Sequence, residues 1–177
     1  MSTHETPTVV PRAQRRRPTL TITAGPLSSG KSSWVRSFRK TRGGPLCLIR
    51  DEVRAEVGGV GYIDGPVDPE IEEAVTARIK EETAQALSDG VDVFLDGCNN
   101  HPLTRIRWEA LATGSAADFR LMFFNLSLEQ IIALNAQRAV PHPREKVESS
   151  FALWEEQFKK AVKRPQHQFI NNQRLSA

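Results

Sequence analysis

Short apolar runs alternate along the chain with longer segments whose apolar residues recur every three or four positions. The short runs are rich in β-branched and aromatic residues and end at polar or glycine positions, which is typical of buried strands. They predict four strands, at residues 19–24, 45–49, 91–96 and 119–125. The pattern therefore predicts strands and helices in regular alternation.

The longest predicted helix begins at Asp68 as the N-cap, has Pro69 in its first turn and ends near Gly90. Its buried face is predicted to consist of Ile71, Val75, Ile79, Thr83 and Leu87. The other predicted helices cover residues 32–42, 51–57, 102–113 and 127–138, where Ser127 and Gln130 have capping-box spacing. A last helix is predicted to have Val147, Phe151, Trp154 and Phe158 on one face and to stop at Pro165. Residues 58–68 contain four glycines and predict a loop.

Strands that are separated by helices form right-handed βαβ units and a parallel sheet. We therefore expect a three-layer α/β/α fold with a mostly parallel sheet, whose ligands bind beyond the carboxyl ends of the strands. A length of 177 residues suits a single domain of this kind, over residues 18–177.

The compartment is indicated by apolar content and by the cysteines. No apolar run approaches the ~20 residues that a membrane span needs, and the amino terminus lacks the apolar core of a signal peptide. Cys47 and Cys98 each adjoin a predicted strand and are best explained as small buried residues under reducing conditions. We therefore expect a cytoplasmic protein without membrane contact.

The segment after the first strand has the sequence of a phosphate-binding loop. It fits the pattern G-x-x-x-x-G-K-[ST] at every fixed position, and the alternative is a glycine-rich turn that only looks similar. Glycines let backbone N–H groups converge on phosphate oxygens, Lys31 reaches the β- and γ-phosphates, and the Ser32 hydroxyl can ligate Mg²⁺. We expect ATP or another nucleoside triphosphate, with Mg²⁺, to bind at Gly25, Pro26, Leu27, Ser28, Ser29, Gly30, Lys31, Ser32 and Ser33.

Charged residues follow the second strand directly, in Arg50-Asp51-Glu52-Val53-Arg54. An acid at this edge can accept the proton of an attacking hydroxyl, which makes Asp51 a candidate general base. An arginine one turn further on can hold a phosphate through two hydrogen bonds, which makes Arg54 a candidate substrate ligand. The alternative is a charged helix start in which Asp51 is the N-cap.

A second polar cluster, at residues 96–102, follows the third strand. Asp96 stands where an acid commonly helps to organise the Mg²⁺ site of nucleoside triphosphatases, and Asn99 can donate a hydrogen bond to a substrate. We expect both to face the substrate. The alternative is an asparagine-rich turn that caps the next helix, and His101 is better explained as a turn residue than as a catalyst.

Arginines on two helices complete the set of candidates. Arg138 lies just before the break Pro141-His142-Pro143, and an arginine on a mobile lid can neutralise the charge that develops in phosphoryl transfer. The alternative is a helix C-terminal arginine that interacts with the helix dipole. Arg105 and Arg107 are predicted only as part of a solvated helix face.

The net charge of +3 is located at the ends of the chain. Residues 1–17 hold four arginines against Glu5, which leaves 20 basic and 20 acidic residues in the rest. This segment, which also contains Pro7 and Pro11, is predicted to be a disordered basic arm, and a second basic stretch follows Glu156. Both can attract nucleic acid, and the alternative is a solubilising surface.

These segments, in this order, resemble the P-loop kinases of the polynucleotide 5′-hydroxyl kinase group. Residues 50–54 are similar to that family's R-D-x-x-R segment, residues 99–109 to its N-x-N-P…R…W-E stretch, and residues 135–138 with Pro141 to its lid. The likeness runs from about residue 20 to residue 165. It implies a P-loop kinase fold with a helical lid, with Asp51 as general base, Arg54 on the acceptor phosphate and Arg138 on the transferring phosphate.

The chain departs from the family at three places, since Leu134 stands where the lid often carries a second arginine, His101 replaces the usual asparagine, and residues 58–68 have no counterpart. These departures bear on the acceptor more than on phosphoryl transfer. Our leading hypothesis is a Mg²⁺-ATP-dependent kinase for the 5′-hydroxyl end of DNA or RNA. The alternatives are a kinase for another alcohol (a hydroxymethylated base, a nucleoside, a sugar acid or another small molecule) and a nucleotide-binding module without transfer. The oligomeric state is not predicted.

Overall fold

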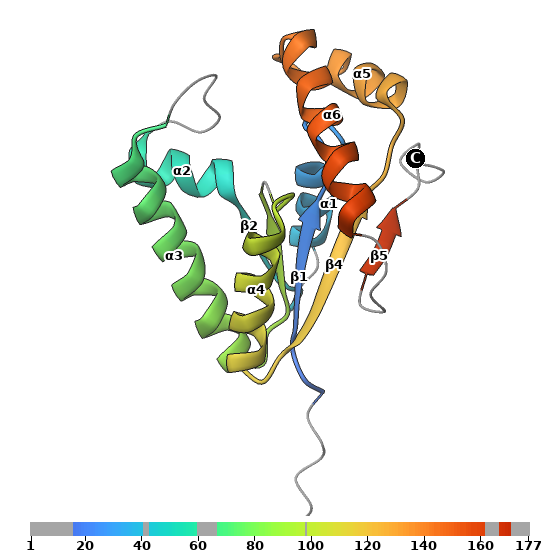
Figure 1. Cartoon of the computed structure of the whole chain (residues 1–177). Helices are drawn as coiled ribbons and strands as arrows, with labels where there is room; N and C mark the ends of the chain where they lie inside the picture. The colour runs from blue at the N-terminus through green and yellow to red at the C-terminus, as the bar shows by residue number, and fades with distance from the viewer. Residues whose placement is uncertain (1–15, 41–42, 60–66, 98, 162–166, 171–177) are drawn as a thin grey trace, which may run out of the picture.

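A parallel β-sheet forms the centre of the protein. The structure is a computed structural model and describes residues 16–40, 43–59, 67–97, 99–161 and 167–170. Within these residues the sheet has five strands in the order β2-β3-β1-β4-β5, with every pair parallel, so the carboxyl ends lie at one edge (Figure 1). The strands are β1 (Thr19–Ala24), β2 (Leu46–Ile49), β3 (Val93–Asp96), β4 (Asp118–Phe124) and β5 (His167–Ile170).

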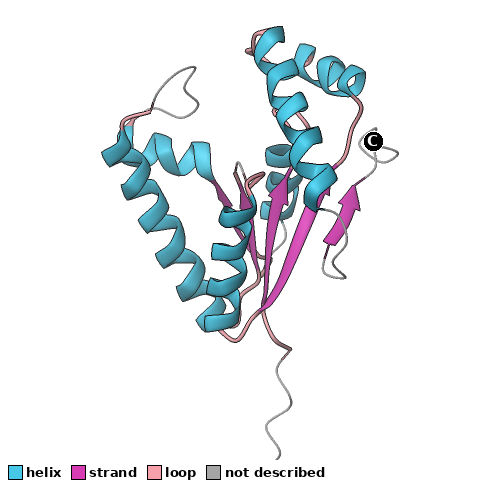
Figure 2. Cartoon of the chain, in the orientation of Figure 1, coloured by secondary structure: helices cyan, strands magenta, loops and turns pink. Residues whose placement is uncertain are grey.

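Helices cover both faces of the sheet, which confirms the predicted three-layer α/β/α fold (Figures 1 and 2). One face carries α1 (Lys31–Ser37), and the other carries α3 (Pro69–Ser88), α4 (Pro102–Gly114) and α6 (Arg144–Ala161). The short helix α2 (Arg50–Gly58) packs on α3. The helix α5 (Leu128–Ala136) contacts α6 beyond the carboxyl edge of the sheet, where the sequence predicts a lid (Figure 1).

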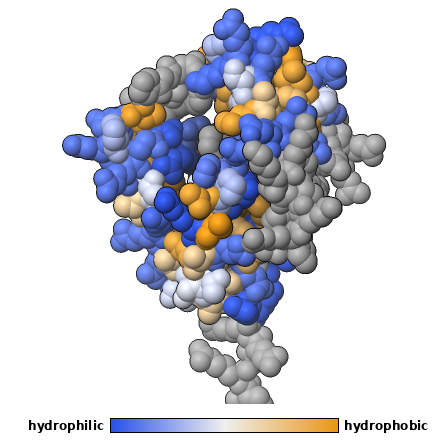
Figure 3. Space-filling view, viewed as in Figure 1, coloured by the Kyte–Doolittle hydropathy of each residue, from blue (hydrophilic) through white to orange (hydrophobic). Residues whose placement is uncertain are grey.

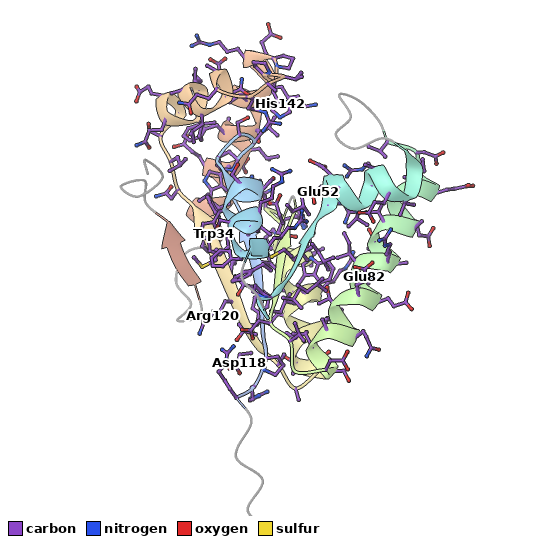
Figure 4. All side chains as sticks on the ribbon, turned by 180° about the vertical axis from the view of Figure 1, so that it is seen from behind. Trp34, Glu52, Glu82, Asp118, Arg120 and His142 are labelled. Atoms are coloured by element: carbon purple, nitrogen blue, oxygen red, sulfur yellow. The ribbon has the colours of Figure 1, made fainter. Side chains whose placement is uncertain are left out.

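The central strand β1 is buried along its whole length, because both of its faces are covered. On the α3–α4–α6 face, Leu20 and Ile22 are fully buried against Val75, Ile79 and Trp154. On the α1 face a separate cluster forms around Trp34, which is labelled in Figure 4. Trp34 meets Phe38 and Phe94 edge to face at centroid distances of 4.9 and 5.2 Å.

Local signals in the sequence predict most helix starts correctly. The Asp68 side chain accepts a hydrogen bond from the Glu70 N–H at 2.9 Å, and Ser127 and Gln130 form the predicted capping box. The first helix is shorter than predicted and continues as a 3₁₀ turn at Phe38–Lys40. The Ser37 hydroxyl donates to the Trp34 carbonyl at 2.7 Å, a local bond that competes with continued helix.

The strand β5 was not predicted. It is a four-residue strand, and its place is decided by parallel pairing with β4, where His167 is in register with Leu121. At the other end of the chain, Arg17 donates to the Ala116 carbonyl at 2.9 Å and Arg16 forms an ion pair with Asp92. The rest of the predicted basic arm, Cys98 and the side chains of the second basic stretch lie outside the described residues.

Among the residues that the structure describes, no helix is both long enough and apolar enough to cross a bilayer.

Candidate active site

The predicted phosphate-binding loop connects β1 to α1 at the carboxyl edge of the sheet. Two of its residues, Ser28 and Gly30, have left-handed backbone with φ of 61° and 87°. Gly25 approaches β4 closely, because a Cβ at this position would lie 2.9 Å from Phe124 Cβ and 3.1 Å from the Phe124 carbonyl oxygen. The first glycine of the motif is therefore required by packing as well as by the turn.

Lys31 lies across its own loop. Its ammonium group donates to the carbonyl oxygens of Gly25 at 3.0 Å and Pro26 at 2.6 Å. The loop and the lysine thus occupy one small volume at the end of β1. This is the arrangement in which an ammonium group can contact a phosphate held by the loop.

Ser32 and Asp96 meet beside this loop, as the sequence predicts for a Mg²⁺ site. The Ser32 hydroxyl donates to Asp96 Oδ2 at 2.5 Å, and the buried Thr23 hydroxyl donates to Asp96 Oδ1 at 2.9 Å. A hydroxyl and a carboxylate are oxygen ligands of the type that Mg²⁺ prefers. Both side chains fit the ion, and the expectation that Asp96 faces the substrate stays a prediction.

The two asparagines after β3 tie that strand to the phosphate-binding loop. Asn99 is buried and its side-chain amide donates to the Thr23 carbonyl at 2.9 Å. Asn100 accepts the Gly25 N–H at 2.9 Å. His101 is the N-cap of α4 and accepts the Leu103 N–H, in agreement with its interpretation as a turn residue. Contact of Asn99 with a substrate stays a prediction.

Arg105 is not part of a solvated helix face, so that prediction was wrong. It is 8% exposed, donates to the Asn100 carbonyl at 2.5 Å and lies over the Phe123 ring. Spacing along α4 could not show this, because the burial depends on how the helix packs on β4. Arg105 therefore supports the loop that holds Gly25.

The charged segment after β2 forms a connected network on α2 and α3. Arg54 is 8% exposed and donates to Asp51 at 2.5 Å and to Glu72. Arg50 donates to the same Glu72 carboxylate at 2.6 Å and to Thr76. The interpretation of Asp51 as helix N-cap is wrong, because Ile49 occupies that position and no side chain caps the helix.

The ion pairs of this network shift the pKa values of two members. Burial opposes the charged form of Arg54, but hydrogen bonds to Glu72 and Asp51 outweigh it and raise the guanidinium pKa. Burial also opposes the charged form of Glu72, but hydrogen bonds from Arg54 and Arg50 lower the pKa of its carboxyl. Glu72 was missed by sequence reasoning, since only the packing of α2 on α3 brings it to this site.

We expect Glu72→Gln to destabilise the fold by about 1–3 kcal/mol at neutral pH, because the nearly buried Arg54 loses a charged partner. The effect depends on pH with a definite sign. A carboxyl whose pKa is lowered in the folded state stabilises the fold above its ordinary pKa, and this is lost as pH falls through the lowered value. Urea unfolding of both proteins should show a difference at pH 7 that shrinks steadily below about pH 4. A difference that is constant from pH 7 to pH 3 would contradict this role.

The helical pair α5–α6 is attached to the phosphate-binding loop through Asn135. Asn135 Oδ1 accepts the Ser28 hydroxyl at 2.9 Å and the His142 N–H at 3.0 Å, and its amide donates to the His142 carbonyl at 2.9 Å. A second link joins the Leu27 N–H to the Ser150 hydroxyl at 2.9 Å. The predicted lid and the loop are thus held in one hydrogen-bonded unit.

Arg138 lies in the turn that follows α5 and is exposed. Its Nε donates to the Val140 carbonyl at 3.4 Å, within the same turn. The expected contact of Arg138 with a transferring phosphate therefore stays a prediction, which requires the turn to approach the loop when nucleotide is bound.

We expect Asn135→Ala to raise the KM for ATP several-fold and to destabilise the protein by about 1–3 kcal/mol. The substitution leaves the His142 backbone groups and the Ser28 hydroxyl without their shared partner. Initial rates at varied ATP and urea unfolding measure the two effects. As a control, Gln137→Ala changes an exposed neighbour in the same turn and should alter neither quantity. Equal behaviour of the two variants would show that Asn135 does not position the loop.

A cavity of about 310 Å³ opens beside Asp96, on the face of the sheet that carries α3 and α4. It is lined by Arg50 and Asp96, so it borders both the charged network and the Ser32–Asp96 pair. Figure 3, which is viewed as in Figure 1, shows a hollow in the molecular surface beside α3 and α4. The candidate site thus consists of the phosphate-binding loop, the Ser32–Asp96 pair, an acid after β2 and an adjoining cavity.

Comparison with known proteins shows which family the chain belongs to. A family model described as AAA domain matches residues 20–161, so the chain belongs to the AAA domain family. Its fold and phosphate-binding loop are those of a P-loop kinase-like domain. No curated protein sequence matches the chain.

Several solved structures share the fold at low identity. The Pnkp1/Rnl/Hen1 RNA repair complex contains a chain that is 21% identical, with a TM-score of 0.69 over 87% of this chain and 49% of that one. This chain therefore spans about half the length of that protein. Chaetomium thermophilum Kti12 in complex with ADP-AlF3 is 16% identical over 87% and 89% of the two chains, with a TM-score of 0.61. A gluconokinase from Sinorhizobium meliloti 1021 is 17% identical over 88% and 83%, with a TM-score of 0.52. The predicted resemblance to P-loop kinases is confirmed, and the structural neighbours include a chain of the Pnkp1/Rnl/Hen1 RNA repair complex.

Proposed function

We propose that the protein is a Mg²⁺-ATP-dependent kinase that phosphorylates a hydroxyl of nucleic acid, most specifically the 5′-hydroxyl end of DNA or RNA. The observation that carries the proposal is the position of Asp51. Ile49, the last residue of β2, is in register with Asp96, which bonds to Ser32. Asp51 follows two residues later and is held by the buried Arg54. An acid that pairs with a buried arginine thus lies at the same sheet edge as the residues proposed to bind metal and phosphate.

Transfer of the phosphoryl group needs three tasks from this chain. The acceptor oxygen bonds to the γ-phosphorus as the bond from that phosphorus to the bridging oxygen of ADP breaks, and Asp51 takes the hydroxyl proton. The Lys31 ammonium group compensates the charge that develops on the phosphate oxygens, and Arg138 joins it when the turn after α5 approaches. Ser32 and Asp96 would hold Mg²⁺, which supplies charge neutralisation between the β- and γ-phosphates.

Nucleic acid is supported as the acceptor by two features. The sequence resembles polynucleotide 5′-hydroxyl kinases in the segments that carry Asp51 and Arg54, and the structure that matches at a TM-score of 0.69 belongs to an RNA repair complex. A small alcohol is the second candidate, since a sugar kinase and a gluconokinase share the fold at TM-scores of 0.53 and 0.52.

A transfer assay with γ-labelled ATP over a panel of acceptors tests the proposal. The panel contains 5′-hydroxyl DNA and RNA, DNA with hydroxymethyluracil, free nucleosides and gluconate. We expect label on the 5′-hydroxyl oligonucleotides, and no label when their 5′ ends are already phosphorylated. Label on gluconate or on a nucleoside alone would establish the small-alcohol kinase. Binding of ATP without transfer to any acceptor would indicate a nucleotide-binding module.

A further inference from the structure

The cavity beside Asp96 has an apolar floor and a basic rim. Ile79, Leu95 and Trp108 form the floor and are nearly or fully buried. Lys80 on α3 and Arg107 on α4 line the rim and are exposed to solvent. An apolar surface beside two cations fits a ligand that is flat and apolar on one side and anionic on the other.

The two cations of the rim, Lys80 and Arg107, form no ion pair with any other described residue. The other cation of the lining, Arg50, is engaged by Glu72, and the one lining carboxylate, Asp96, accepts from Ser32 and Thr23. Two cations from facing helices therefore remain available to one anionic group at the mouth of the cavity.

Arg54, the arginine that the sequence predicts for the acceptor phosphate, is differently placed. Its side chain is 9% exposed and bonds to both Asp51 and Glu72. Its Nε and Nη1 donors face carboxylates of the protein, and it does not line the cavity. Arg54 is thus suited to orient Asp51, and its expected contact with the acceptor phosphate stays a prediction.

We propose that this cavity binds the acceptor nucleoside and that Lys80 and Arg107 bind the phosphate on its 3′ side. The inference rests on the proposed function and names the substrate contact of the same site. A terminal nucleoside with a 5′-hydroxyl carries its next phosphate at the 3′ position, so base and phosphate lie on one unit. The base packs on the floor beside Trp108, the phosphate meets the two cations, and the 5′-hydroxyl is directed toward Asp96 and Asp51.

Matched acceptors with and without the phosphate test this assignment. Adenosine 3′-monophosphate and adenosine differ only in the group that Lys80 and Arg107 would bind. We expect Lys80→Gln and Arg107→Gln each to raise the KM for adenosine 3′-monophosphate about tenfold. The KM for adenosine and for ATP should change less than twofold, and kcat should be retained. Arg120→Gln serves as control, because Arg120 is an exposed cation on β4 that does not line the cavity. Figure 4 shows it toward the end of the sheet opposite to His142, which follows α5.

Equal changes of KM for the two acceptors, or no change for either, would overturn the phosphate contact while the kinase assignment stands. Wild-type transfer to gluconate with no transfer to adenosine 3′-monophosphate would overturn the nucleotide assignment.

A binding measurement separates the failure of this inference from the failure of the proposed function. Calorimetric titration of adenosine 3′-monophosphate is carried out with saturating Mg²⁺ and ADP, so that ADP occupies the phosphate-binding loop. We expect the Kd to rise about tenfold in each cation variant and to stay unchanged in Arg120→Gln. This result supports the cavity assignment even if no transfer is detected. Absence of binding to the wild-type protein, or equal Kd values for all variants, overturns it.

Discussion

Replacing Lys31 with alanine is expected to abolish nearly all phosphoryl transfer while the protein stays folded. The Lys31 ammonium group lies within hydrogen-bond distance of the Gly25 and Pro26 carbonyls, at the place where the loop holds phosphate. Its loss removes a positive charge from the transferring group, and groups of this kind contribute about 10²–10³-fold to the rate. The rate of label transfer at saturating acceptor measures the effect, and circular dichroism checks the fold.

Two controls make the Lys31 result specific. Arg120→Ala removes an exposed cation from β4 and should leave the rate unchanged. Lys31→Arg keeps the charge but places a larger, planar group in the small volume of the loop, so we expect it to be inactive too. A Lys31→Ala protein with a rate near that of the wild type would show that this loop is not the phosphate site.

Asp51→Asn is expected to lower kcat by about 10²–10⁴-fold and to leave the KM for ATP unchanged. Asparagine keeps the oxygen that accepts the Arg54 hydrogen bond, so the network on α2 and α3 is preserved. It cannot take the proton of the acceptor hydroxyl, which is the single task that the substitution removes. Steady-state rates with varied ATP and varied acceptor separate these quantities.

The neighbouring carboxylate gives a matched control for Asp51. Glu52 lies in the same turn of α2 but pairs with Arg36 and Arg39 on the other side of the helix. Burial opposes the charged form of the Glu52 carboxyl, but hydrogen bonds from Arg39 and Arg36 and their charges together outweigh it and lower the pKa. Glu52→Gln should therefore retain kcat. Equal rates for the two variants, whether high or low, would remove the special role of Asp51.

How far the sequence predicts this site depends on the distance along the chain between interacting residues. The phosphate-binding loop, the Asp68 cap and the Ser127 capping box involve residues a few positions apart, and all three are found where the pattern predicts them. Pairing of the sheet also follows from alternation, since strands that are separated by helices must be parallel. That rule alone brings Asp51 and Asp96 to one edge.

The contacts that decide the chemistry connect distant residues. Arg54 and Glu72 are 18 positions apart, and Ser28 and Asn135 are 107 apart. No local spacing relates such partners, because they meet only when α2 packs on α3 and when α5 and α6 come to lie above β1. The same reason explains why Arg105 was wrongly assigned to the surface and why β5 was missed.

The sequence by itself therefore determined the order of the first four strands and of the helices, the class of fold and the loop with the phosphate-binding pattern, because each depends on local pattern and on the rule for parallel crossovers. Only the tertiary structure decided what surrounds them. It buried Arg54 between two carboxylates, linked Asn135 to Ser28 and placed Lys80 and Arg107 on one cavity. Burial and proximity across layers result from packing of whole helix faces, and a residue's own neighbours in sequence do not specify them.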